Sequence, residues 1–227
     1  MRSIVSLQNC REYDSTRVRE AVARALLEVP TTTDLLRSGR RILLKPNIVN
    51  PRGPERPVCT HPQVLRAVAE ICHEAGCLLL VADQPTYWLT GRTGSQQPAA
   101  PGLFHTTGYV EVCKGLPVDW ALCASAGYRE FPVPRPYHVP VAHLTRLLDE
   151  VDGTINLPKL KTHMQTRLTG AVKNTFGLVA PRQRMDLHML GNPALSEAIV
   201  DTFAAYRPEL SVLDAVVAME GAGPVRG

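Results

Sequence analysis

Short, almost wholly apolar runs separated by amphipathic segments dominate the first part of the chain. The runs RILLKP at 41–46 and CLLLVAD at 77–83 have the length and continuity of strands buried on both faces. Between them, HPQVLRAVAEICHEAG carries apolar residues at helical spacing and closes at Gly76, and an earlier helix is expected to begin near Ser15. Strand, helix and strand in this order predict a three-layer α/β fold, with a mainly parallel sheet and helices on both faces.

The same patterns continue along the chain. They predict an opening strand at 4–7, a helix over 105–116, a strand over 118–123, helices over 141–151, 165–176 and 193–206, and strands over 152–158 and 210–215. Residues 84–104 have many turn formers and no periodicity, which predicts a long loop that is either mobile or functional. A length of 227 residues suffices for one well-cored domain, so 1–227 is expected to form a single α/β domain.

Composition narrows the classes of partner and the compartment. The formal charge is +4, the arginines are scattered and aromatic residues make up 5%, so we expect no nucleic-acid partner. The sequence contains no apolar run of membrane-spanning length and no signal-peptide core near its N-terminus, so we expect no membrane partner. Its six cysteines include no C-x-x-C pair, which favours buried, reduced thiols in a cytoplasmic protein.

Lysine is rare in this chain and unevenly placed. Twenty arginines stand against five lysines. Four of the five follow predicted strands or lie shortly after them (Lys45, Lys159, Lys161 and Lys173), and only Lys114 lies elsewhere. An ammonium group supplies a compact charge with three rotatable donors, and its pKa shifts readily when it is buried. These positions therefore predict either a clamp for a small anion or an amine that exchanges a proton.

Polar residues also gather at the carboxyl ends of four predicted strands. They are Lys45 and Asn47, then Asp83, then Lys159, Lys161, Thr162 and His163, and finally Asp214 and Glu220. In open α/β sheets, ligands bind outside the carboxyl ends of the strands, so we expect one shared site at this edge. For Asp83, simple capping of the following turn is an equal alternative.

The segment after Lys161 offers a more specific prediction. If 165–176 is helical, its threonines and Lys173 share one face, and the helix start presents backbone N–H groups to a phosphate or carboxylate. Thr162 with Gln165 also fits a capping box, in which case Thr162 is purely structural.

Histidines and known motifs add little. His163 and His188 are the histidines best placed for acid–base work, whereas Cys59 with His61 is too little for a zinc site, so we predict no metal site. The sequence contains no Walker A loop, no G-x-S-x-G, no H-E-x-x-H and no G-x-G-x-x-G after a strand.

Five short motifs together resemble one family. KPN at 45–47, THP at 60–62, NLPKLKTH at 156–163, TGAVKNTFG at 169–177 and DAVVAMEGAGP at 214–224 resemble the domain of unknown function 362 family, in the same order and over nearly the whole chain. The resemblance implies an uncharacterised protein, often associated with iron–sulfur clusters, whose relatives generally continue beyond GPVRG. Because this chain has no C-x-x-C-x-x-C run, we expect no intrinsic iron–sulfur cluster, and the cofactor stays unknown.

These observations lead to three hypotheses of function. The first is an enzyme acting on a small anionic metabolite, with a redox step through an external electron carrier. The second is an isomerase or racemase similar in outline to nickel-dependent lactate racemase, and the third is a non-catalytic module for anion binding or docking. Besides the anion, a homodimer or an electron-transfer partner is expected.

In the enzyme hypothesis each candidate residue has a role. Lys173 or His163 transfers a proton. Among the substrate-binding residues, Lys45, Lys159 and Lys161 clamp the anion, and Asn47 and Asn174 orient it by hydrogen bonds. The other expected substrate-binding residues are Thr162, Asp214 and Glu220.

Overall fold

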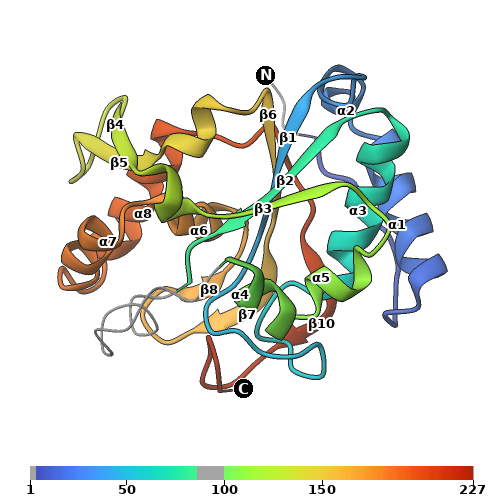
Figure 1. The fold of residues 1–227 in the computed structure, drawn as a ribbon. Coiled ribbons are helices and arrows are strands. Elements are labelled where there is room, and N and C mark those ends of the chain that lie inside the picture. Colours follow the sequence, from blue (N-terminus) through green and yellow to red (C-terminus); the bar gives the residue numbers. More distant parts are fainter. Residues whose placement is uncertain (1–3, 86–99, 227) are drawn as a thin grey trace.

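A five-stranded parallel sheet runs through the centre of the computed structural model, which describes residues 4–85 and 100–226 (Figure 1). The strand order is β3-β2-β1-β6-β9, and every neighbouring pair is parallel. The strands are β1 (Arg41–Pro46), β2 (Leu78–Asp83), β3 (Val118–Leu122), β6 (Gly153–Leu157) and β9 (Leu210–Ser211). The strands predicted at 41–46, 77–83, 118–123 and 152–158 are therefore confirmed.

Helices cover both faces of this sheet. One face carries α1 (Ser15–Leu27), α3 (Pro62–Glu74), α4 (Ala100–Thr106) and α5 (Tyr109–Val112); the other carries α6 (Ala171–Asn174), α8 (Ala194–Ala205) and the hairpin of β4 (Tyr128–Pro132) with β5 (Val141–Thr145) (Figure 1). Along β1, Ile42 and Leu44 belong to the first hydrophobic core and Leu43 to the second. This alternation of wholly buried residues confirms the predicted three-layer α/β fold.

The other helical segments are short. They are α2 (Thr31–Leu35), α7 (Pro181–His188) and the 3-10 turns η2 (Cys123–Ala126), η3 (Arg146–Asp149) and η4 (Thr175–Leu178). None of the helices within 4–85 and 100–226 is long and apolar enough to cross a membrane.

A second, three-stranded sheet lies below the carboxyl edge of the main sheet in Figure 1. Its order is β10 (Asp214–Met219), β7 (Lys159–His163) and β8 (Arg167–Thr169), with β10 parallel and β8 antiparallel to β7. The chain passes from β6 into β7 at Pro158. Because side chains alternate along a strand, Lys159, Lys161 and His163 share one face of β7.

One predicted helix is wrong, and another is right only in its second half. Residues 141–151 form β5 and η3 instead. Residues 141–145 are a strand because they pair with β4 in an antiparallel hairpin. Residues 165–176 form the end of the β7–β8 hairpin, then α6 and the start of η4. Thr162 accordingly lies inside a strand, so neither the capping box nor the helical face of threonines exists.

Other predicted elements are absent or divided in the structure, because the hydrophobic pattern did not show where they end. Residues 4–7 are not in a strand, and Ile4, Val5 and Leu7 are exposed because no sheet edge pairs with them. The predicted helix at 105–116 is divided by Gly108, whose φ of 79° ends one helix before the next begins. The strand at 210–215 is divided between β9 and β10, in different sheets. Within the predicted loop 84–104, residues 100–104 belong to α4 and 86–99 lie outside the described residues.

Candidate functional site at the carboxyl edge of the sheet

Lys45 and Asp83 form a buried ion pair where β1 and β2 end. The Lys45 ammonium lies 2.7 Å from Asp83 Oδ1, and their side chains are 1% and 2% exposed. The ammonium also donates to the carbonyl of Pro46, at 2.8 Å, while Asp83 accepts from the backbone N–H groups of Ile48 and Gln84. Such a pair is stable only with these additional hydrogen bonds. The positive charge of Lys45 is therefore neutralised by the protein itself.

A second buried ion pair joins β7 and β10, two neighbouring strands of the second sheet. The Lys159 ammonium lies 2.9 Å from Asp214 Oδ2 and donates to the Tyr13 hydroxyl at 2.6 Å, and that hydroxyl donates to Asp214 Oδ1. The backbone N–H of His61 also donates to Asp214 Oδ2, at 2.8 Å. Burial raises the pKa of Tyr13, and the charge of Asp214 raises it further. Lys159, like Lys45, thus has its carboxylate partner within the fold.

Three asparagine side chains connect the strand ends to α6. Asn47 Nδ2 donates to Asn174 Oδ1 at 2.8 Å, and Asn174 Nδ2 donates to Asn156 Oδ1 at 2.7 Å and to the carbonyl of Lys45 at 3.2 Å. All three asparagines are buried. This chain of amides fixes the position of α6 and hence of Lys173, which precedes Asn174 in sequence.

Lys161 differs from the two paired lysines. Its side chain is 1% exposed, its ammonium donates to the carbonyl of Val58, and no described carboxylate forms an ion pair with it. Burial lowers the pKa of Lys161 to about 8; Cys59 partly opposes this shift, and the charges of Lys173 and Lys159 add to it. A buried ammonium with one neutral acceptor retains two donors and most of its charge for another partner.

Lys173 and Arg184 extend this uncompensated charge. Burial lowers the pKa of Lys173 to about 8, with Arg184 adding to the effect, and the ammonium lies 5.6 Å from the Phe176 ring. Arg184 on α7 donates through Nη1 to the carbonyl of Gln84 at 3.1 Å. Its Nη2 is buried without a hydrogen-bond partner among the described residues, and burial lowers its pKa although Asp83 opposes the shift. We call Lys161, Lys173 and Arg184 the cation cluster.

Two histidines beside the cation cluster have complementary ring nitrogens. His163 Nδ1 accepts from the backbone N–H groups of Gln165 and Thr166, so its neutral ring carries the proton on Nε2. His188 Nδ1 lies 2.6 Å from the carbonyl of Arg184 and must donate to it, which leaves Nε2 as an acceptor. Burial, followed by neighbouring cations, lowers the pKa of His163 to about 3, and burial also lowers that of His188. His188 rather than His163 presents a basic nitrogen.

Other predicted residues lie elsewhere. The Thr162 hydroxyl accepts from the Gly223 N–H at 3.3 Å, and Glu220 is exposed after β10. Sequence reasoning missed Tyr13 and Arg184. Arg184 lies four residues before His188 in a segment for which no element was predicted, and this helical spacing beside a candidate histidine was the available signal.

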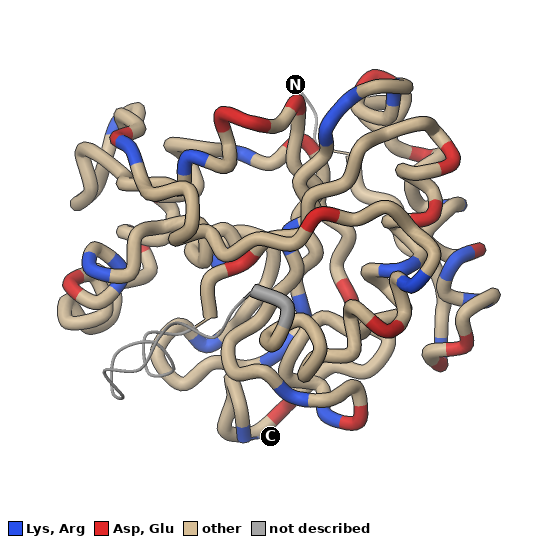
Figure 2. Tube along the Cα trace, in the orientation of Figure 1, with Lys and Arg blue, Asp and Glu red and all other residues tan. Residues whose placement is uncertain are grey.

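Metal ligation has no visible basis in the part of the chain that the structure describes. Across 4–85 and 100–226, no three or more His, Cys, Asp or Glu side chains group so as to hold a metal ion. Figure 2 shows Lys and Arg positions over much of the molecule, some of them in its lower half. The fold and this edge define an α/β protein with a cationic site at the carboxyl ends of its strands.

Comparisons with known proteins identify the family. The model of the family described as Domain of unknown function (DUF362) matches residues 42–227, so the chain belongs to this family. The chain is also similar to the thylakoid-associated protein sll1697 of Synechocystis sp., with 32% identity over 226 residues, covering 98% of this chain and 66% of that protein. The chain thus spans just under two thirds of the length of this relative.

Proposed function

We propose that this chain is an enzyme that acts on a small anionic metabolite bound at the cation cluster. One observation carries the proposal: Lys161 and Lys173 have pKa values of about 8 and no carboxylate partner among the described residues. The other two lysines at this edge are each paired with a buried aspartate. Charge that the fold leaves uncompensated costs stability, and an anionic ligand would offset that cost.

The residues suggest separate tasks. Lys161, anchored by Val58, serves as the fixed cation that holds the anion, and the Arg184 Nη2 group supplies a further donor. Lys173, with a pKa of about 8, exists in both protonation states near neutral pH, which suits a group that takes a proton from the substrate and returns it. Lys45 and Lys159 have a structural role at the site, because each ammonium group is already paired with a buried aspartate. A redox step through an external carrier stays a prediction from the family resemblance.

Binding is tested with malonate and inorganic phosphate as probes, by isothermal titration calorimetry at pH 7. We expect saturable binding of at least one probe, and affinity at least tenfold weaker in Lys161→Met, Lys173→Met and Arg184→Met. Lys114→Met removes an exposed lysine and is the matched control, with unchanged affinity. Wild-type affinity in all three cluster variants would contradict the proposal.

Catalysis is tested separately, by exchange of carbon-bound hydrogen in 2-oxo and 2-hydroxy acids dissolved in D₂O, followed by NMR. We expect exchange with the wild type and a loss of at least tenfold in Lys173→Arg, since a guanidinium keeps the charge but does not release its proton near neutral pH. Anion binding without any exchange would favour the non-catalytic binding module instead.

A further inference from the structure

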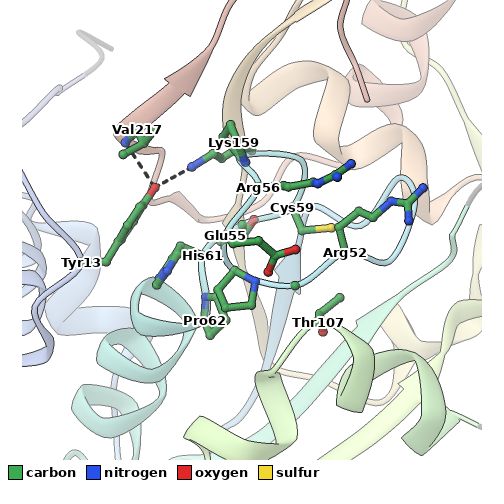
Figure 3. A pocket seen from close by; sticks show the side chains of 14 residues that line it. Tyr13, Arg52, Glu55, Arg56, Cys59, His61, Pro62, Thr107, Lys159 and Val217 are labelled. Atoms are coloured by element: carbon green, nitrogen blue, oxygen red, sulfur yellow. Dashed lines mark hydrogen bonds between the residues drawn. The ribbon is translucent and has the colours of Figure 1, made fainter. Parts of the chain in front are cut away.

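A cavity of about 230 Å³ lies beside Lys159, between the N-terminal segment and the proline-rich loop that follows β1 (Figure 3). Its volume is many times the space that one water molecule needs, so it has room for a small organic molecule. Tyr13 and His61 lie on one side in Figure 3, and Arg52 and Arg56 lie on the other. No pattern in the sequence predicted a pocket here.

The inner wall of the cavity is largely apolar and electrically neutral. Tyr13 and His61 stack with ring centroids 3.5 Å apart and an interplanar angle of 7°, and Pro62 and Val217 add apolar surface. Lys159 reaches the wall but is compensated by Asp214. Burial lowers the pKa of His61 to about 4, so this ring is neutral at pH 7. The wall therefore favours the apolar body of a ligand.

The mouth of the cavity is charged. Arg52, Glu55 and Arg56 are exposed there, and no described residue forms an ion pair with any of the three side chains. Two cations and one anion leave a net charge of +1. The start of α3 adds only its dipole, because Pro62 has no N–H and the side chain of His61 already accepts from the N–H of Gln63.

We propose that this cavity binds an organic monoanion, a molecule with a planar apolar body and one carboxylate. The body packs against the Tyr13–His61 stack and the prolines, and the carboxylate meets Arg52 and Arg56 at the mouth. A neutral molecule forgoes the two guanidinium partners, and a second negative charge is opposed by Glu55. The net charge of +1 at the mouth thus selects a ligand by the number of its charges as well as by their sign.

This site is separate from the cation cluster. The segment from Val58 to Thr60 lies between them: Cys59 and Thr60 line the cavity, whereas the carbonyl of Val58 accepts from Lys161. The proposal therefore does not depend on the proposed function. A ligand here would be a second reactant or an effector of the neighbouring site.

The experiment measures binding of benzoate, benzamide and phthalate to the full chain by calorimetry at pH 7. These probes share one ring and carry one, no and two negative charges. We expect benzoate to bind at least tenfold more tightly than benzamide or phthalate. The double variant Arg52→Met/Arg56→Met should lose at least tenfold in benzoate affinity, while Arg207→Met, which removes an exposed arginine elsewhere, should not change it.

Two further variants locate the site. Val217→Trp places a large ring on the cavity wall at a position that is 45% exposed, so it should block benzoate without disturbing the core. Lys173→Met should leave benzoate binding within twofold of wild type, which separates this site from the cation cluster. Equal binding of benzamide, unchanged binding in the double arginine variant or in Val217→Trp, or no benzoate binding at all would overturn the proposal.

Discussion

At the scale of single residues, Gly177 shows how tightly the paired lysines are enclosed. A Cβ atom at this position would lie 2.6 Å from Asp83 Oδ1 and 2.8 Å from the Lys45 ammonium. Both groups are held in a buried ion pair, so they have no room to move aside. We predict that Gly177→Ala lowers the free energy of unfolding by about 2–4 kcal/mol, as expected when a buried pair is disrupted.

Urea denaturation measures this loss, and Gly170→Ala in the same motif is the control. A Cβ at Gly170 meets no atom within 4 Å, and its backbone is extended, so a change below about 0.5 kcal/mol is expected. Similar stabilities for the two variants would show that the ion pair tolerates displacement.

Lys161 makes a prediction about pH at the same scale. Its pKa in the folded state is about 8, against 10.5 for an ordinary lysine, so between these values the unfolded chain binds the extra proton. Stability therefore rises with pH across this window, and the cost of burying the charge is greatest below pH 8. Relative to Lys161→Met, the wild type should gain on the order of 1–3 kcal/mol between pH 7 and pH 10.5.

The comparison with Lys161→Met removes contributions from buried cysteines and tyrosines, which titrate in the same range and oppose the trend. Urea midpoints at several pH values measure the difference. The exposed Lys114→Met should show no such drift relative to wild type. A flat difference for Lys161→Met would mean that Lys161 has an ordinary pKa.

The candidate site could be predicted only in part from the sequence. The four lysines were found because three lie at or just after the ends of predicted strands, which parallel strands bring together, and Lys173 lies in the segment that follows. Their division into paired and unpaired groups was hidden, since it depends on where Asp83 and Asp214 point in the folded chain. Arg184 was missed because α7 reaches this edge through tertiary packing alone.

At the scale of elements, buried parallel strands were predicted well and short segments poorly. The central residues of the runs at 41–46 and 77–83 are apolar without alternation, which is typical of strands in a sheet covered on both faces. The turn and strand β8 instead replaced the first part of the helix predicted at 165–176, because residues 167–169 pair with β7 although the same residues also fit helical spacing. When two periods fit equally, the available pairing partner decides.

The hairpin gives an element-scale prediction. His163 Nδ1 accepts from two backbone N–H groups in the turn, and an asparagine oxygen can do the same from a similar position. We predict that His163→Asn keeps nearly full stability, whereas His163→Leu loses about 1–2 kcal/mol by leaving the N–H groups without their acceptor. Urea denaturation of both variants measures this. Equal losses would show that the ring itself, and not its acceptor, supports the turn.

At the scale of the whole molecule, the carboxyl edge holds three half-buried histidines as well as lysines. His61, His163 and His188 come from different elements, and burial lowers the pKa of each. All three are therefore neutral in the folded protein at pH 7, each within reach of at least one cation or buried carboxylate. An additional proton on any of the three rings would add positive charge to a region where Lys161, Lys173 and Arg184 already have no carboxylate partner among the described residues.

This arrangement predicts that stability falls steeply as the pH is lowered from 6.5 toward 4. The unfolded chain binds a proton at each histidine near pH 6.5, while the folded pKa values of His61 and His163 are about 4 and about 3. Each histidine thus contributes a loss of about 1 kcal/mol per pH unit in this window. Urea midpoints at pH 7, 6 and 5 should reveal it, and the double variant His61→Gln/His163→Asn should flatten the curve. An equally steep curve in that variant would place the acid sensitivity in other groups and remove the histidines from the electrostatic account of this edge.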